Sequence, residues 1–303
     1  MTSSYVRSRP GDLFSSTSAV VMSEVVKFIL SLFIVFHEEG KTLNKFMHCL
    51  KTQIIEDPKD NLLILIPGVL YMVQNNLLYV SYTNLSPAVF QVSYQLKILT
   101  TAVFSRVMLN KLLSSHQWTS LFLLFLGVAA TNIDFLGISS TQVLVEDVKR
   151  NFFLGIISVL LACTISGAAG VYFEKLLKGS KKSVALRNIQ LSFIGLFTGL
   201  ISCFVKEGQE ISEKGFFHGY DSMVWLVILL QSAGGLIVAA VVKYADTILK
   251  GYATSISIVI TFVLSFLFLH SELHYNVIFG SFLVIVATIQ YSYFPYEKPE
   301  LPK

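Results

Sequence analysis

The chain has 303 residues, of which 53% are hydrophobic and only 14% are charged. Soluble domains carry about 25% charged residues, so the composition excludes an ordinary soluble protein and predicts a membrane protein. The formal net charge of +4, with no basic module interleaved with aromatic residues, gives no indication of a nucleic-acid partner. Cys49, Cys163 and Cys203 are too few and too widely spaced for a disulfide framework or a zinc site. We expect them to pack as small apolar residues, and we expect no metal and no cofactor.

Nine stretches of the sequence are long and apolar enough to cross a bilayer as helices, since one crossing needs about 20 mostly apolar residues. They are Ser18–Phe36, Asn61–Tyr82, Pro87–Leu109, Gln117–Phe135, Asn151–Leu176, Asn188–Val205, Met223–Lys243, Thr247–Leu269 and Tyr275–Phe294. We therefore expect an all-α membrane protein. No linker divides it into soluble domains.

A weak internal repeat relates the two halves of the chain. A shift of the sequence against itself superimposes identical residues of the third and fourth stretches on the eighth and ninth: Tyr94 on Tyr252, Ile98 on Ile256, Phe104 on Phe262, Leu109 on Leu267 and His116 on His274. This pairing leaves four spans in the first half and five in the second. Internal repeats with a binding site between them are typical of transporters. We expect a five-plus-five helical bundle from which the first helix is missing.

The expected organisation has three parts. A polar N-terminal segment, 1–17, precedes a single transmembrane domain, 18–294, and a tail, 295–303, follows it. The domain comprises a truncated first repeat, 18–135, and a second repeat, 151–294. Most lysines and arginines outside the spans fall on the side of the C-terminus, which the positive-inside rule places in the cytosol, with the N-terminus in the lumen.

Charged residues inside spans are costly and are often functional. Glu24 and Lys27 lie three residues apart in the first span and so share a helix face. One interpretation is an internal ion pair that neutralises itself. The alternative is that Lys27 faces a cavity and meets an anion.

The second span contains three consecutive amides, Gln74, Asn75 and Asn76. They cannot all face lipid, because each unsatisfied polar group there costs several kcal/mol. Some could join neighbouring helices, and at least one is expected to face a water-filled path. Tyr71 lies one turn before Asn75 and shares its face.

The third span carries a polar arc of Gln91, Tyr94, Lys97, Thr101 and Ser105, with Gln95 just outside it. Lys97 lies near the middle of the span and needs an anionic partner or water. Either it forms a structural salt bridge, or it contacts an anionic substrate.

Two further regions have alternative interpretations. The small residues of segment 166–170 either let helices approach closely or leave room for a ligand. The tight turn between the seventh and eighth spans holds two lysines, Lys243 and Lys250. They are either ordinary cytosolic charges or part of an anion path at a helix N-terminus, which favours phosphate.

Several ordered motifs resemble the nucleotide-sugar transporters of the solute-carrier type. The segments that carry the resemblance are 74–80, 90–97, 170–175, 187–190, 214–220 and 243–246 with 249–251, and the similarity extends over nearly all of 16–293. The resemblance implies ten helices in two inverted five-helix repeats in the Golgi membrane, with the endoplasmic reticulum as the alternative. It also implies exchange of a cytosolic nucleotide-sugar for a lumenal nucleoside monophosphate.

The resemblance also maps a nucleotide pocket onto this chain. With Tyr94 from the polar arc, the expected substrate-binding residues are Lys27, Tyr71, Asn75, Phe90, Tyr94, Lys97, Ser166, Asn188, Ser192 and Lys250. Lys97 and Lys250 would hold phosphate, and Asn75, Ser166 and Asn188 would contact the base and ribose.

The CMP-sialate branch of this family has a tyrosine where this chain has Phe90, and a second pocket tyrosine where this chain has Ser192. It also has a Thr-Ser pair where this chain has Val238-Ala239. These differences favour the branches for UDP-N-acetylglucosamine and UDP-galactose, with UMP as the counter-substrate. Thr247 stands where the family usually has asparagine.

Two other function classes remain as alternatives. A membrane-embedded glycosyl-transferring enzyme would need an acidic catalytic motif, and the sequence contains none that we recognise. We therefore expect no enzymatic activity. A non-transporting isoform or scaffold subunit, bound to glycosyltransferases or to a sister transporter, is the second alternative. Lipid surrounds the protein in either case, and homo- or hetero-oligomers are compatible with it.

Overall fold

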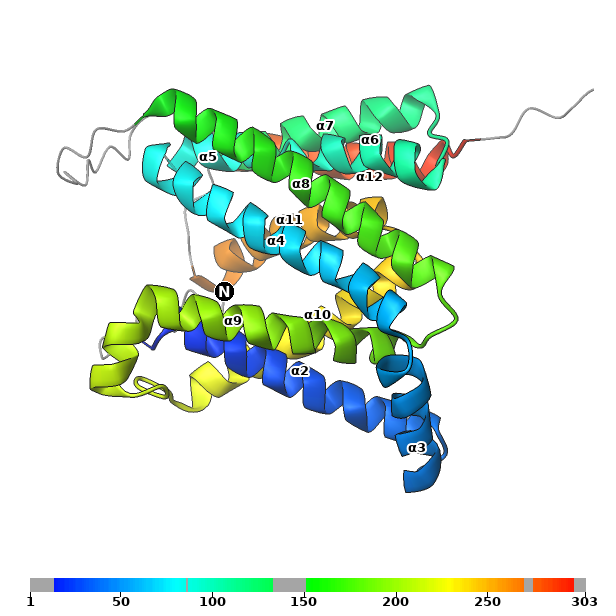
Figure 1. Ribbon diagram of the computed structural model, residues 1–303. Helices are drawn as coiled ribbons and strands as arrows, with labels where there is room; N and C mark the ends of the chain where they lie inside the picture. The colour runs from blue at the N-terminus through cyan, green and yellow to red at the C-terminus, as the bar shows by residue number, and fades with distance from the viewer. Residues whose placement is uncertain (1–13, 86, 133–150, 270–274, 297–303) are drawn as a thin grey trace, which may run out of the picture. The chain divides into compact units, whose positions relative to one another are not determined.

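The computed structural model describes residues 14–85, 87–132, 151–269 and 275–296, and every regular element in these ranges is a helix (Figure 1). The elements are α2 (Ser16–Glu38), α3 (Leu43–Leu50), the short π-helix η1 (Lys51–Ile55), α4 (Pro58–Asn84), α5 (Pro87–Tyr94), α6 (Lys97–Leu109), α7 (Ser115–Asn132), α8 (Phe152–Gly179), α9 (Val184–Lys214), α10 (Ser222–Tyr244), α11 (Thr247–Leu269) and α12 (Tyr275–Tyr293). The prediction of an all-α membrane protein is confirmed.

Each of the nine predicted spans corresponds to helical structure. Among the described residues, six helices are long and apolar enough to cross a membrane: α2, α4, α8, α9, α10 and α12. The third predicted span is interrupted, because α5 ends at Tyr94 and α6 begins at Lys97. Helix α11 has 23 residues, most of them apolar, and α7 has 18 residues with polar side chains at both ends. A count of nine crossings therefore stays a prediction.

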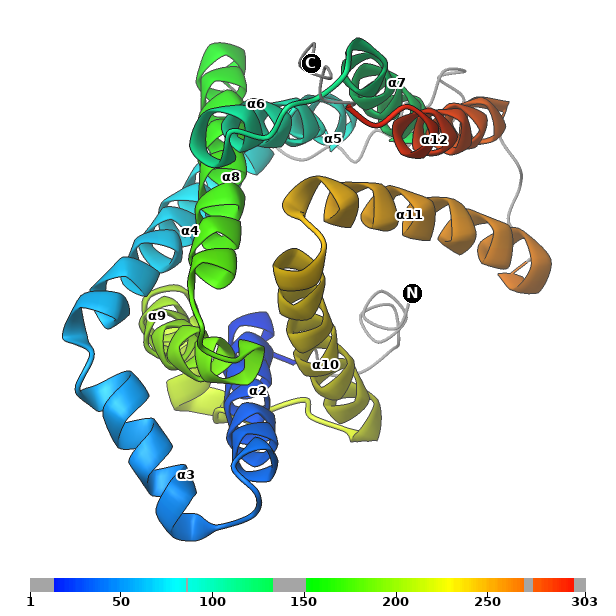
Figure 2. The same cartoon turned by 90° about the vertical axis from the view of Figure 1, so that its right-hand side faces the viewer.

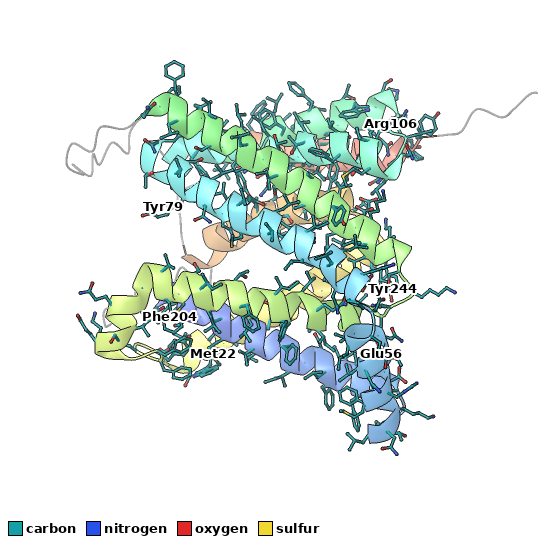
Figure 3. The ribbon with its side chains drawn as sticks, viewed as in Figure 1. Met22, Glu56, Tyr79, Arg106, Phe204 and Tyr244 are labelled. Carbon is teal, nitrogen blue, oxygen red and sulfur yellow. The ribbon has the colours of Figure 1, made fainter. Side chains whose placement is uncertain are left out.

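Large apolar side chains are exposed along the membrane-crossing helices. Figure 3 labels Tyr79 on α4 and Phe204 on α9, whose side chains are 61% and 70% exposed. Apolar residues exposed in such numbers on long apolar helices match a lipid environment better than water.

The chain forms two compact units. The first comprises residues 1–69 and 176–246, and the second comprises 70–175 and 247–303. Each unit contains helices from the first predicted repeat and from the second. Helices α4 and α8 each contribute residues to the two units. The prediction of a repeat at 18–135 and another at 151–294 remains a prediction.

In the first unit, α2 lies alongside α9 and α10 (Figures 1 and 2). Val35 of α2 and Ile189 of α9 are buried in one apolar cluster. The short helix α3 contributes Cys49 to this cluster, with Phe46 and Leu50 packed against it. The sequence predicted spans only, and α3, with eight residues between two of them, was not among the predicted elements.

A charged network joins the start of α4 to the start of α9. Asp60 accepts two hydrogen bonds from the Arg187 guanidinium, at 2.6 and 2.8 Å, and one from Lys182 at 2.6 Å. Gln190 donates to Asp60 at 3.2 Å and to Asn61 at 2.6 Å. Since the Arg187 side chain is only 2% exposed, its charge depends on Asp60 for compensation. Two residues of the 187–190 motif thus have a structural role.

We expect Asp60→Asn to destabilise the protein by about 3 kcal/mol, because the buried Arg187 charge would lose its partner. Asp57→Asn is the matched control. The Asp57 side chain is 41% exposed and contacts Lys182 at 3.0 Å, so its removal should cost less than about 1 kcal/mol. Unfolding of the two variants in the same detergent checks this. Equal losses of stability would contradict the role assigned to Asp60.

In the second unit, α7 and α12 run side by side (Figures 1 and 2). Leu121 and Leu124 of α7 and Val284 of α12 are buried in its main apolar cluster, together with Tyr252 of α11. The Tyr252 hydroxyl lies 2.9 Å from the Ser120 hydroxyl, which satisfies two buried polar groups. This core supports the helices that surround the cavity described next.

Candidate functional site

The second unit encloses a cavity of about 320 Å³, at the lower end of the range usual for ligand pockets. Five segments surround it: the later part of α4, the end of α5, the start of α6, the middle of α8 and the first three turns of α11. The lining residues are Tyr71, Gln74, Tyr94, Gln95, Lys97, Ile98, Thr101, Ser166, Gly170, Thr247, Ile248, Lys250, Gly251, Thr254, Ser255 and Ile258.

Two lysines, Lys97 of α6 and Lys250 of α11, line this cavity. Within the described parts of the chain, neither forms an ion pair with a carboxylate. Both side chains lie in the wall of the same cavity, so two positive charges share one site. Two partly buried cations that repel each other and lack an acidic partner form a site suited to an anion with more than one negative charge. The interpretation of Lys97 as half of a structural salt bridge is not supported.

Aromatic and amide groups complete the polar wall. The Lys97 ammonium lies over the Tyr94 ring, 4.3 Å from its centroid. The Tyr94 hydroxyl accepts a hydrogen bond from Gln74 Nε2 at 2.9 Å. Gln74 is 95% buried, and its Oε1 has no partner among the described residues. A buried acceptor without a partner, in the wall of a cavity, is available to a donor on a ligand.

The position of these groups depends on the interruption between α5 and α6. The N–H groups of Gln95, Leu96 and Ile98 bond to carbonyls three residues back rather than four. This tighter winding changes the direction of the side chains, so that Tyr94, Gln95 and Lys97 all line the cavity. No glycine or proline lies at the break, which explains why the sequence predicted one continuous span.

The N-terminus of α11 is tied to α8. The N–H of Thr247 donates to Oε2 of Glu174 at 2.8 Å, and the Thr247 hydroxyl donates to the Gly170 carbonyl at 3.3 Å. Glu174 is 1% exposed, and a carboxylate at a helix N-terminus is electrostatically favourable. Glu174 therefore occupies the Thr247 N–H, one of the helix N-terminal donors that we considered for phosphate. Lys250 lines the cavity one turn later in α11.

The cavity brings together half of the predicted substrate-binding residues: Tyr71, Tyr94, Lys97, Ser166 and Lys250. Phe90 is 3% exposed and stacks on Tyr94 with 5.6 Å between ring centroids, so it supports the wall without lining it. The Asn75 side chain is exposed. The side chain of Gln91 lies outside the described residues. Ser105 is buried but does not line the cavity. The substrate-binding roles of Phe90 and Asn75 stay predictions.

The other three predicted residues, Lys27, Asn188 and Ser192, belong to the first unit. Lys27 Nζ lies 2.7 Å from Glu24 Oε1, which supports the interpretation of an internal ion pair. Asn188 donates to the Val184 carbonyl at 2.9 Å, and the Ser192 hydroxyl is buried. Their contact with substrate likewise stays a prediction.

Several lining residues were not in our sequence-based set. Gln74 was recognised only as one of three amides, and Gln95 was placed just outside the polar arc because a continuous helix was assumed. The hydroxyl groups of Thr247, Thr254 and Ser255 come from the first turns of α11. Thr247 and Thr254, three residues before and four after Lys250, share its helix face, which was a usable signal that we did not follow.

The two neighbouring amides of α4 provide a direct test. We expect Gln74→Leu to weaken nucleotide binding about five-fold or more, because it removes the free acceptor and the donor to Tyr94. Asn75→Leu, the matched control, should change binding less than about two-fold because its side chain is exposed. Calorimetric titration with UMP measures both. A larger loss for Asn75→Leu would contradict this assignment and support the role predicted from the resemblance.

Long apolar helices define a multi-pass membrane protein, and its cavity is lined by two lysines that form no ion pair within the described ranges. The sequence profile of the nucleotide-sugar transporter family matches residues 1–292, and the chain belongs to this family. The family predicted from the sequence motifs is therefore confirmed.

Curated relatives agree with this assignment. The chain is 44% identical over 290 residues to the UDP-N-acetylglucosamine transporter of Rattus norvegicus, covering 94% of this chain and 87% of that protein. The human protein of the same name is also 44% identical, over 287 residues with the same coverage. The UDP-galactose translocator of Mus musculus is 46% identical over 288 residues, covering 95% of this chain and 73% of that protein.

Proposed function

We propose that this protein is an antiporter that imports a UDP-sugar into the Golgi lumen in exchange for UMP. The observation that carries the proposal is the pair of lysines, Lys97 and Lys250, that line one cavity without a carboxylate partner among the described residues. The diphosphate of a UDP-sugar and the phosphate of UMP both supply the missing negative charge.

The two partly buried cations also give a physical reason for exchange rather than one-way transport. An empty cavity leaves both ammonium groups uncompensated in a partly desolvated site. A carrier that returns with UMP keeps phosphate beside the lysines in both half-cycles. Exchange should therefore be faster than return of the empty carrier, because only the empty carrier must move with its charges unpaired.

The sugar is proposed from the relatives and from the sequence. Relatives named for UDP-N-acetylglucosamine and for UDP-galactose have similar identity to this chain, so either sugar, or both, is the proposed cargo. The absence of a tyrosine hydroxyl at Phe90 agrees with these branches. A Golgi location agrees with such cargo, with the endoplasmic reticulum as the alternative site.

Exchange in proteoliposomes tests the proposal. Vesicles preloaded with UMP should take up UDP-N-acetylglucosamine or UDP-galactose at least about ten-fold faster than empty vesicles, while CMP-sialic acid should not be taken up. Equal uptake by loaded and empty vesicles would contradict antiport. No uptake of any nucleotide-sugar, with intact binding of a glycosyltransferase or a related transporter, would favour the scaffold alternative.

A further inference from the structure

The interruption between α5 and α6 leaves a backbone carbonyl without its helical partner. In a regular helix the Tyr94 carbonyl would accept from the N–H of Ile98. Here the Ile98 N–H bonds to Gln95 at 3.0 Å instead. A buried carbonyl needs a substitute donor, since an unsatisfied one costs about 1–3 kcal/mol.

Cys163 of α8 supplies that donor. Its Sγ lies 3.5 Å from the Tyr94 carbonyl oxygen and 3.6 Å from that of Ser93, within the range for a thiol donor. Cys163 is 1% exposed and does not line the cavity, so it does not itself meet a ligand there. Its contacts are instead with the backbone that carries Tyr94.

Two more contacts fix α8 at the break. The Thr100 hydroxyl donates to the Cys163 carbonyl at 2.8 Å. One turn further, a Cβ added to Gly167 would lie 2.8 Å from Thr100 Oγ1 and 2.9 Å from the Thr101 nitrogen. Helices α8 and α6 therefore touch backbone to backbone, and the thiol has little freedom to move away from the break.

We propose that Cys163 is a positioning residue for substrate binding, whose thiol holds the α5–α6 break so that Tyr94 and Lys97 both face the cavity. This inference rests on the proposed function, because it assigns to Cys163 an effect on nucleotide binding. The chemistry required at position 163 is a small hydrogen-bond donor, which serine can supply and alanine cannot.

Calorimetric titration with UMP compares the wild type with Cys163→Ala, Cys163→Ser and Cys203→Ala. Cys203, also buried but located in the first unit, is the matched control. We expect Cys163→Ala to weaken UMP binding about five-fold, the effect of losing one modest hydrogen bond. Cys163→Ser should stay within about two-fold of the wild type, and Cys203→Ala should bind normally. Normal binding by Cys163→Ala, or equal impairment of the serine variant, would overturn the proposal.

Hydrogen–deuterium exchange separates this inference from the proposed function. In the ligand-free protein, amides in segment 93–100 should exchange faster in Cys163→Ala than in the wild type and in Cys163→Ser. If the wild type fails to bind UMP while exchange responds in this way, the nucleotide role fails but the structural role of the thiol stands. Unchanged exchange in Cys163→Ala would overturn the inference whatever the wild type binds.

Discussion

Replacing Lys97 with methionine should lower UDP-sugar exchange at least about ten-fold while leaving the protein folded. A charge-assisted hydrogen bond contributes about 1.5–3 kcal/mol, and each 1.4 kcal/mol is a factor of ten in affinity. Lys97 shares its cavity with a second lysine, Lys250, and has no carboxylate partner among the described residues. Its removal should therefore not destabilise the ligand-free protein, as removal of a paired lysine would.

The two effects can be measured together. The melting temperature of Lys97→Met without ligand should equal or exceed that of the wild type, whereas the rise in melting temperature caused by UMP should be largely lost. Lys45→Met is the matched control, because Lys45 is exposed on α3. It should exchange normally and keep the full response to UMP. Near-normal exchange by Lys97→Met would rule out the phosphate contact.

The second large effect should come from the crossing of α7 and α12. A Cβ added to Gly280 would lie 2.6 Å from the Gly127 carbonyl oxygen and 2.8 Å from the Thr131 backbone nitrogen. Backbone atoms cannot move aside as a flexible side chain can, so the helices would have to separate. We expect Gly280→Ala to destabilise the protein by about 1–3 kcal/mol and Gly280→Val to prevent normal folding.

Gly234→Ala is the control for this prediction. Gly234 also lies inside a helix, α10, but a Cβ there would meet no heavy atom within 4 Å. Alanine should therefore be neutral, or stabilising by up to about 1 kcal/mol through its higher helix propensity. Thermal unfolding in one detergent compares the two. A Gly280→Ala variant as stable as Gly234→Ala would show that the close crossing does not contribute to stability.

Helices were predictable from the sequence where a local pattern determines them. Each of the nine apolar stretches contains helix, because a backbone in lipid must satisfy its own hydrogen bonds. The interruption at Gln95 was not predictable, since it depends on a thiol and a glycine of α8, more than 60 residues away in sequence. Helix α3 was missed because its apolar side packs on α2 and α9 and is too short to resemble a span.

Only part of the candidate site was predictable from the sequence. Lys97, predicted near the middle of an apolar span, is a strong signal whatever surrounds it, and it lines the cavity together with Lys250 from the first turn of α11. Which of two adjacent amides faces inward depends on the rotation of α4. Sequence favoured Asn75 through the resemblance, whereas the structure places Gln74 in the cavity and exposes Asn75.

Discrimination between UMP and uridine tests most directly whether the two lysines hold phosphate. Calorimetric titrations of both ligands into the wild type and the Lys97→Met Lys250→Met double variant give the ratio of the two affinities. The account predicts that the wild type binds UMP at least about ten-fold more tightly than uridine, and that the double variant binds the two alike. A double variant that still prefers UMP to the same degree would contradict it.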